Sequence, residues 1–167
     1  MKRLRVVTIG VLALAVSWVV ATFAQEAKSL DRPWQPVVID AGAFPQLNST
    51  PVRHLHLFAY RSQQGGGTWE RIPYQVDEKD SADFFGRTNG LFDGFDQLVF
   101  MVRDMGDKAP PQAWLDDVES RSKPRVEIEV ADPAHPARRA WVYLYVTSSI
   151  TELPPSYGMS AGWAEAP

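Results

Sequence analysis

The sequence RVEIEVADPAHPARRAWVYLYVT, residues 125–147, decides the fold of this chain. Polar and apolar residues alternate from Arg125 to Val130, and a period of two places successive side chains on opposite faces of a β-strand. Residues 132–136 contain two prolines and favour a turn. A second strand follows over 138–147, with one aliphatic face (Ala140, Val142, Leu144, Val146) and one aromatic face (Trp141, Tyr143, Tyr145).

The same period of two continues toward the N-terminus. It predicts strands over 36–40, 52–61 and 68–76. The last two form a hairpin, because the glycines of 62–67 permit the positive φ angles of a tight turn. Pro73 indicates an edge strand or a bulge, since proline cannot donate a ladder hydrogen bond.

The centre of the chain has a different pattern. The unbroken apolar run within residues 97–103 predicts a strand that is buried on both faces, and residues 114–119 favour a single helical turn. No long helical period follows residue 24. We therefore predict an all-β fold, an antiparallel β-sandwich or partly closed barrel of about six or seven strands, preceded by an N-terminal hydrophobic helix.

The N-terminus is typical of an exported protein. Lys2, Arg3 and Arg5 precede an uncharged, largely apolar run over 6–24, and such a run enters the bilayer while the bases stay on the cytoplasmic side. The small residues before Gln25 suit a cleaved signal peptide, whereas the length of the run suits a retained signal anchor. Both readings stay open at this stage.

The chain therefore divides into three parts: a signal peptide or signal anchor over 1–24, a β-sandwich domain over 25–147, and an irregular tail over 148–167 that resembles a truncated continuation. We expect the domain to be periplasmic, cell-surface or secreted. If residues 6–24 are retained, they anchor it in the inner membrane.

The charge and the absence of cysteine exclude several classes of function. The formal net charge is −3, and residues 1–24 hold basic but no acidic residues, so the exported part is more acidic still. This charge disfavours nucleic acid as a partner. The chain contains no cysteine, which excludes disulfides, thiol nucleophiles and thiolate metal sites.

An acidic segment over 77–107 is the first candidate site. Calcium prefers six to eight oxygen ligands on a bent loop, and the segment offers such ligands at Asn89, Asp93, Asp96 and Asp104. The same carboxylates could instead cap turns in a solvated loop, or act as the acid and base of a glycoside hydrolase. Calcium is the one cofactor that this pattern suggests.

Two further candidates lie on predicted strands. His54 and His56 are two apart and would share a face, where a metal needs further ligands that the strand does not supply. The aromatic face of Trp141, Tyr143 and Tyr145 would bind a protein partner or a carbohydrate if it were exposed, and would otherwise form core.

Three segments together carry a resemblance: IPYQVDE (72–78), DGFDQLVFM (93–101) and DMGD (104–107). This pattern resembles uncharacterised exported prokaryotic proteins with a β-rich N-terminal region. The resemblance implies export and strand content, and it transfers no activity.

The function expected from the sequence is that of an exported, non-catalytic β domain for binding or assembly, with a calcium-stabilised acidic loop. One alternative is a membrane-anchored accessory subunit of a larger membrane complex. The other is a carbohydrate-active or other hydrolase that uses the loop carboxylates.

Overall fold

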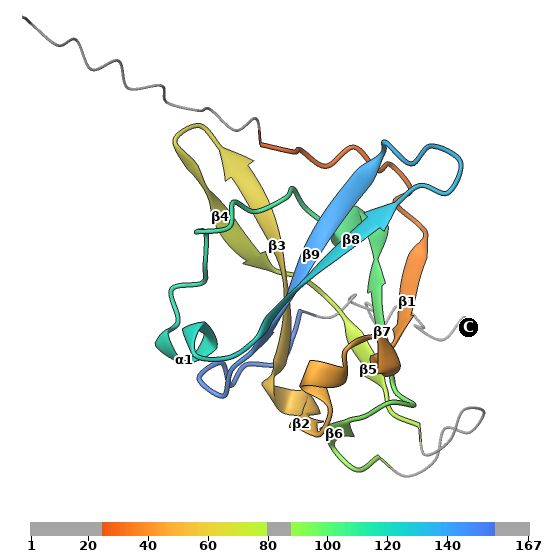
Figure 1. Ribbon diagram of the computed structural model, residues 1–167, viewed down its shortest axis with the longest axis vertical. Helices are drawn as coiled ribbons and strands as arrows, with labels where there is room; N and C mark the ends of the chain where they lie inside the picture. The colour runs from red at the N-terminus through yellow and green to blue at the C-terminus, as the bar shows by residue number, and fades with distance from the viewer. Residues whose placement is uncertain (1–24, 80–87, 156–167) are drawn as a thin grey trace, which may run out of the picture.

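The computed structural model describes residues 25–79 and 88–155, and short strands account for most of its regular structure (Figure 1). The predicted signal segment 1–24 and the tail residues 156–167 lie outside the described residues, as do residues 80–87 of the acidic segment. The strands are β1 (Pro36–Asp40), β2 (Thr50–Pro51), β3 (Leu55–Gln63), β4 (Gly66–Arg71), β5 (Gln75–Asp77), β6 (Leu91–Phe92), β7 (Gln97–Met101), β8 (Arg125–Ala131) and β9 (Arg139–Val146). Short helical turns are η1 (Ala41–Ala43), η2 (Pro45–Leu47), η3 (Val52–His54), η4 (Val102–Asp104) and α1 (Val118–Arg121).

The strands form three antiparallel sheets. The largest has the order β4-β3-β9-β8, the second β1-β7-β5, and the smallest pairs β2 with β6. The prediction of an all-β chain is confirmed, and no barrel closes among the described strands. None of the helices within residues 25–79 and 88–155 has the length and hydrophobicity needed to cross a membrane.

One aliphatic core joins the two larger sheets. β3 and β9 each contribute every second side chain, those that point to one face of their sheet. β7 contributes Leu98 and Phe100, and β1 adds the partly buried Val37 and Ile39. Burying one such aliphatic or aromatic side chain stabilises the fold by about 1.5–3 kcal/mol. The predicted aliphatic face of β9 lies in this core, which contains Ala140, Val142 and Leu144.

A second, aromatic core lies on the opposite face of the four-stranded sheet. Trp141 is 1 % exposed, and Tyr143 and Tyr145 are 0 % exposed, so these three residues do not form the exposed binding stripe that the sequence allowed. The long connection between β7 and β8 supplies Ala109, Trp114 and Leu115 to this core. β9 is therefore buried on both faces.

The four-stranded sheet splits into a fork, and the chain itself fills the fork (Figure 1). β3 and β9 pair directly from Leu55–Val146 to Phe58–Tyr143. Beyond that point Gly106 exchanges backbone hydrogen bonds with Trp141, at 2.8 and 3.0 Å, and the Asp107 N–H donates to the Tyr60 carbonyl at 2.9 Å. Residues 106–107 thus act as a short bridging segment between the two diverging strands.

Several predicted boundaries differ from the structure. β7 ends at Met101, and its side chains alternate between buried and half-buried, so only one face is fully buried. Residues 52–54 form η3 rather than the start of a strand. Pro73 separates β4 from β5, as a residue that cannot donate to a ladder should. The predicted helical turn lies later, at α1, because the Asp117 carboxylate accepts the Ser120 N–H and caps it.

Candidate functional site

The acidic segment uses its best-placed carboxylates to hold its own backbone. Asp96 is 1 % exposed, and its two oxygens accept the N–H groups of Lys79 at 2.9 Å and Asp93 at 2.8 Å. The Asp93 carboxylate accepts the Asn89 side-chain amide at 3.1 Å and the Phe95 N–H at 3.2 Å. Three of the predicted calcium ligands therefore form one hydrogen-bonded turn.

The fourth predicted ligand, Asp104, belongs to another part of the molecule. It follows β7, whereas Asp96 precedes that strand, and five strand residues span about 16 Å. The four residues are therefore not brought together. Among the described residues, no three His, Asp or Glu side chains cluster in a way that could hold a metal ion. Asp80 and Asp83 belong to residues 80–87, which the structure does not describe. The calcium site therefore stays a prediction.

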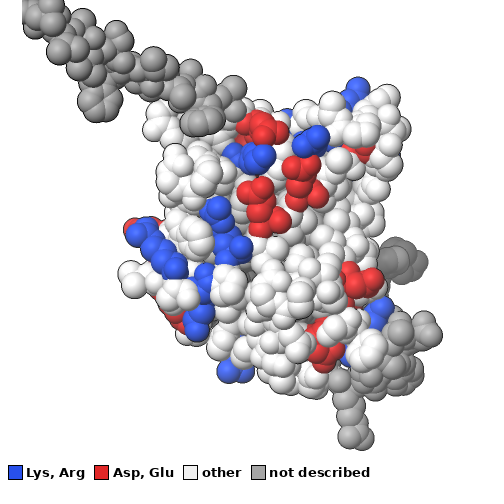
Figure 2. All heavy atoms as spheres, viewed as in Figure 1, with Lys and Arg blue, Asp and Glu red and all other residues white. Residues whose placement is uncertain are grey.

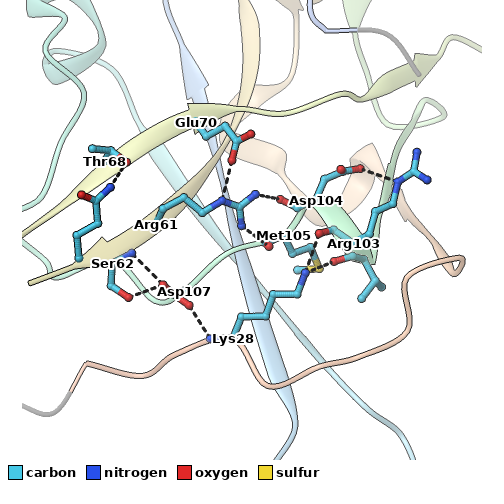
Figure 3. A network of polar contacts seen from close by, with 11 residues as sticks. Lys28, Arg61, Ser62, Thr68, Glu70, Arg103, Asp104, Met105 and Asp107 are labelled. Atoms are coloured by element: carbon cyan, nitrogen blue, oxygen red, sulfur yellow. Dashed lines mark hydrogen bonds and ion pairs between the residues drawn. The ribbon is translucent and has the colours of Figure 1, made fainter. Parts of the chain in front are cut away.

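Asp104 instead lies in a polar network around the fork (Figure 3). Arg61 donates to the Asp104 and Met105 carbonyls at 2.9 and 2.6 Å, and it pairs with Glu70 at 2.7 Å. The Asp107 carboxylate accepts the N–H of Lys28 at 2.7 Å and the N–H and hydroxyl of Ser62. Residues 104–107 (DMGD) therefore connect β3 to the N-terminal segment that contains Lys28.

Burial raises the pKa of Asp107, but the hydrogen bonds from Ser62 and Lys28 outweigh that effect and hold the pKa below its usual value. Lys28 completes the network by donating to the carbonyls of Val102 and Arg103, both at 2.8 Å. The hydrogen bonds described here all connect one part of the chain to another, so the network stabilises the fold and offers no open site for a ligand.

A different arrangement surrounds His56, at the start of β3. Its side chain is 2 % exposed, and its Nε2 lies 3.2 Å from the Thr147 carbonyl. Arg71, at the end of β4, places Nη2 2.9 Å from His56 Nδ1. Because a guanidinium can only donate, Nδ1 accepts, and the imidazole is neutral with its proton on Nε2.

The chemistry of His56 agrees with that geometry. Burial and the charge of Arg71 lower the pKa of His56 from 6.5 to about 4. Both ring nitrogens are occupied, and His54 lies in η3 rather than on the strand. The alternative of a metal held between these two histidines therefore finds no support in their geometry, and His56 does not lie on a solvent face either.

Arg71 itself carries a charge that no described carboxylate neutralises. Nη1 donates to the Glu152 and Leu153 carbonyls at 2.9 and 3.2 Å, and Nη2 donates to the neutral His56. Its Nε is buried and has no hydrogen-bond partner. The ion pairs among the described residues use other cations. A buried donor without an acceptor is rare in folded proteins and costs about 1–3 kcal/mol.

Arg71 lies at a cavity of about 280 Å³. The apolar walls come from three separated parts of the chain, namely Val52, Tyr74, Val76, Leu153 and Pro154, while Arg53, His56, Thr151 and Glu152 complete the lining. The Tyr74 hydroxyl donates to the Leu55 carbonyl. Burial raises the pKa of Tyr74, and the nearby Arg71 opposes that rise. The cavity therefore combines apolar walls, a neutral imidazole and two guanidinium groups.

Apart from His56, no residue singled out in the sequence for a candidate site lines this cavity. Arg71 pairs with Phe58 in the β3–β4 register, which places it diagonally across from His56. Such a neighbour could be found from the hairpin once its register is known. The wall formed by residues 151–154 has no periodic pattern, and so it could not be placed from the sequence.

The charged groups on the face drawn in Figure 2 do not single out a second site. Figure 2 shows basic side chains over α1 and the start of β8, with acidic side chains beside them over β8 and β9. Several of these charges pair, as in Arg139–Glu129 and Lys108–Glu26. Both signs of charge are therefore present on this face.

No protein-family model, curated protein or solved structure matches this chain.

Proposed function

We propose that this chain is an exported, non-catalytic β-rich binding module, and that the cavity between η3, β4, β5 and residues 151–154 is where it contacts its ligand. The observation that carries this proposal is the place of Arg71, which lines a cavity of about 280 Å³ and whose charge no described carboxylate neutralises. Ligand sites are concave, mostly apolar and furnished with a few polar groups, and this cavity has each of these properties.

The neutral His56 fits a binding role better than a catalytic one. Its two ring nitrogens are taken by Thr147 and Arg71, and its pKa of about 4 leaves it uncharged at neutral pH. A general base needs a free nitrogen within reach of the proton that it removes. His56 therefore serves to orient the guanidinium of Arg71.

A thermal-shift screen tests the proposal. The purified domain would be heated with mixed sets of small cations, neutral molecules and anions, because a ligand that binds only the folded state raises its Tm by mass action. We expect at least one set to raise Tm with saturation, and Val76→Phe, which fills part of the cavity, to abolish the rise. No shift with any of the sets would refute the binding role.

Export rests on the bases at 2, 3 and 5 and the uncharged run over 6–24. Fractionation of the producing cells should place the protein beyond the inner membrane. Alkaline carbonate extraction then separates the two forms: a cleaved module is released, whereas an accessory subunit with a retained anchor stays in the membrane. Recovery from the cytosol would contradict export in either form.

A further inference from the structure

We infer that the ligand of the His56–Arg71 cavity is a small organic carboxylate with an apolar body. This inference rests on the binding role proposed above and adds the chemical class of the ligand. It starts from the electrostatics of Arg71, since a guanidinium is charged at every physiological pH.

The charge of Arg71 needs an anion that the described part of the fold does not supply. Its acceptors at hydrogen-bond distance are two backbone carbonyls and one neutral imidazole, and the nearby Tyr74 hydroxyl is neutral as well. Arg53 brings a second cation to the same lining and is likewise outside the described ion pairs. The only acid in the lining is Glu152, whose residue is exposed. The lining is thus net positive, and an anion is the complementary ligand.

The charge of the lining favours a carboxylate. Three of the five N–H groups of Arg71 already donate to the fold, so a ligand meets chiefly its charge. Arg71 and Arg53 against Glu152 leave one positive charge in excess, which a carboxylate neutralises, whereas a phosphate group carries about −1.5 to −2 at pH 7.

The walls and the volume of the cavity indicate what the rest of the ligand is like. Val52, Val76 and Pro154 offer no hydrogen bonds and contact best an apolar body. A cavity of about 280 Å³ lies at the small end of the ligand-site range of about 300–1,000 Å³. A benzoate-sized or hexanoate-sized anion fits this description, whereas an oligosaccharide does not.

The probes are benzoate and hexanoate, compared with benzyl alcohol, hexanol, inorganic phosphate and acetate. Titrations followed by NMR should shift the Nε–Hε resonance of Arg71 with saturation for the first two anions. The neutral alcohols share the apolar body, and phosphate and acetate lack it, so each should bind at least tenfold more weakly.

Charge variants at Leu153 give a second measurement that spares the fold. This cavity-lining residue is 88 % exposed, so Leu153→Asp and Leu153→Lys should leave the structure intact while weakening and strengthening benzoate binding about threefold each. Val118 is 87 % exposed and is absent from the cavity lining, so Val118→Asp and Val118→Lys are the matched controls and should leave affinity unchanged. Arg71→Gln, which removes the charge, should weaken benzoate binding at least tenfold.

The outcomes separate this inference from the proposed function. If benzyl alcohol binds as well as benzoate, or if the Leu153 charges do not alter affinity, the cavity binds apolar molecules and the carboxylate assignment is wrong while the binding role stands. If phosphate binds more tightly than benzoate, the apolar body is wrong. If no probe shifts Arg71 and the wider thermal-shift screen is also negative, both proposals fail.

Discussion

Two arginines on one hairpin, Arg61 on β3 and Arg71 on β4, behave in opposite ways. Arg61 donates to two backbone carbonyls and pairs with Glu70, so its charge is balanced at the fork. Arg71 also donates to two backbone carbonyls, but its third described partner is a neutral histidine and its Nε has none. At the fork, the charge of Arg61 is balanced by groups of the fold, whereas at the cavity no described carboxylate balances the charge of Arg71.

This difference separates residues that build the molecule from residues that are available to a ligand. A charge with a complete set of internal partners contributes to stability and offers little to a second molecule. A buried donor without an acceptor costs free energy that binding can recover. Four predictions challenge the comparison, beginning with the largest expected effect.

Gly106→Ala should destabilise the domain by about 3 kcal/mol or more. A Cβ atom at Gly106 would overlap the Tyr60 carbonyl oxygen, which belongs to the backbone of β3 and cannot rotate away. Urea unfolding measures the loss. Gly94→Ala is the control, since a Cβ there meets no atom within contact range. Equal stability of the two variants would mean that residues 106–107 do not wedge the fork.

His56→Gln should flatten the acid dependence of stability. The pKa of His56 is about 4 in the folded chain and 6.5 when unperturbed, so the unfolded state binds the proton first as pH falls. The wild type therefore loses stability from about pH 6.5 down to about pH 4, by at most about 3 kcal/mol.

Glutamine keeps one donor and one acceptor without titrating. Unfolding at pH 7 and at pH 4.5 should therefore show a smaller change for His56→Gln than for the wild type. Equal changes would indicate that folding does not lower the pKa of His56, and the burial of this imidazole beside the Arg71 guanidinium would be wrong.

Asp107→Asn should cost about 2 kcal/mol, because the carboxylate accepts from Lys28 and twice from Ser62 and an amide presents one donor face to them. Ser62→Ala removes one of these donors and should cost less, about 1 kcal/mol. Chemical unfolding of both variants gives the ranking. Benzoate affinity should be unaffected in each, since the fork and the cavity are separate; a shared loss would join the two regions.

Asp96→Asn should cost about 1 kcal/mol, through the loss of one of two backbone N–H acceptors in the acidic turn. The same turn tests the calcium hypothesis. If the segment holds calcium, a chelator should lower Tm, because an ion bound only by the folded state stabilises it by mass action. An unchanged Tm would contradict a calcium site in this segment.

The sequence predicted the local elements well where one period dominates. The expected strand over 36–40 coincides with β1, and β8 and β9 lie within one residue of the expected ranges. The hairpin of β3 and β4 forms around the predicted glycines. These elements depend on side-chain alternation and turn chemistry, both of which are local properties.

The errors arise where tertiary contacts decide. Trp141, Tyr143 and Tyr145 could have been an exposed stripe, and only the covering segment that carries Trp114 and Leu115 makes them core. The sequence also does not show which backbone N–H groups Asp93 and Asp96 accept, and the calcium site of the acidic segment stays a prediction. Arg71 was not singled out from the sequence, because what distinguishes it is the absence of a described carboxylate beside its charge, and only the structure shows this.

The position of β9 constrains how this domain acquires its structure. β9 contributes to the aliphatic core, to the aromatic core and to the bridge with Gly106, and it is the last of the described strands. Neither core can be completed until the chain has been made as far as Val146. The unfinished chain therefore exposes both apolar faces, and a truncation before β9 should yield a protease-sensitive chain and not a smaller folded one.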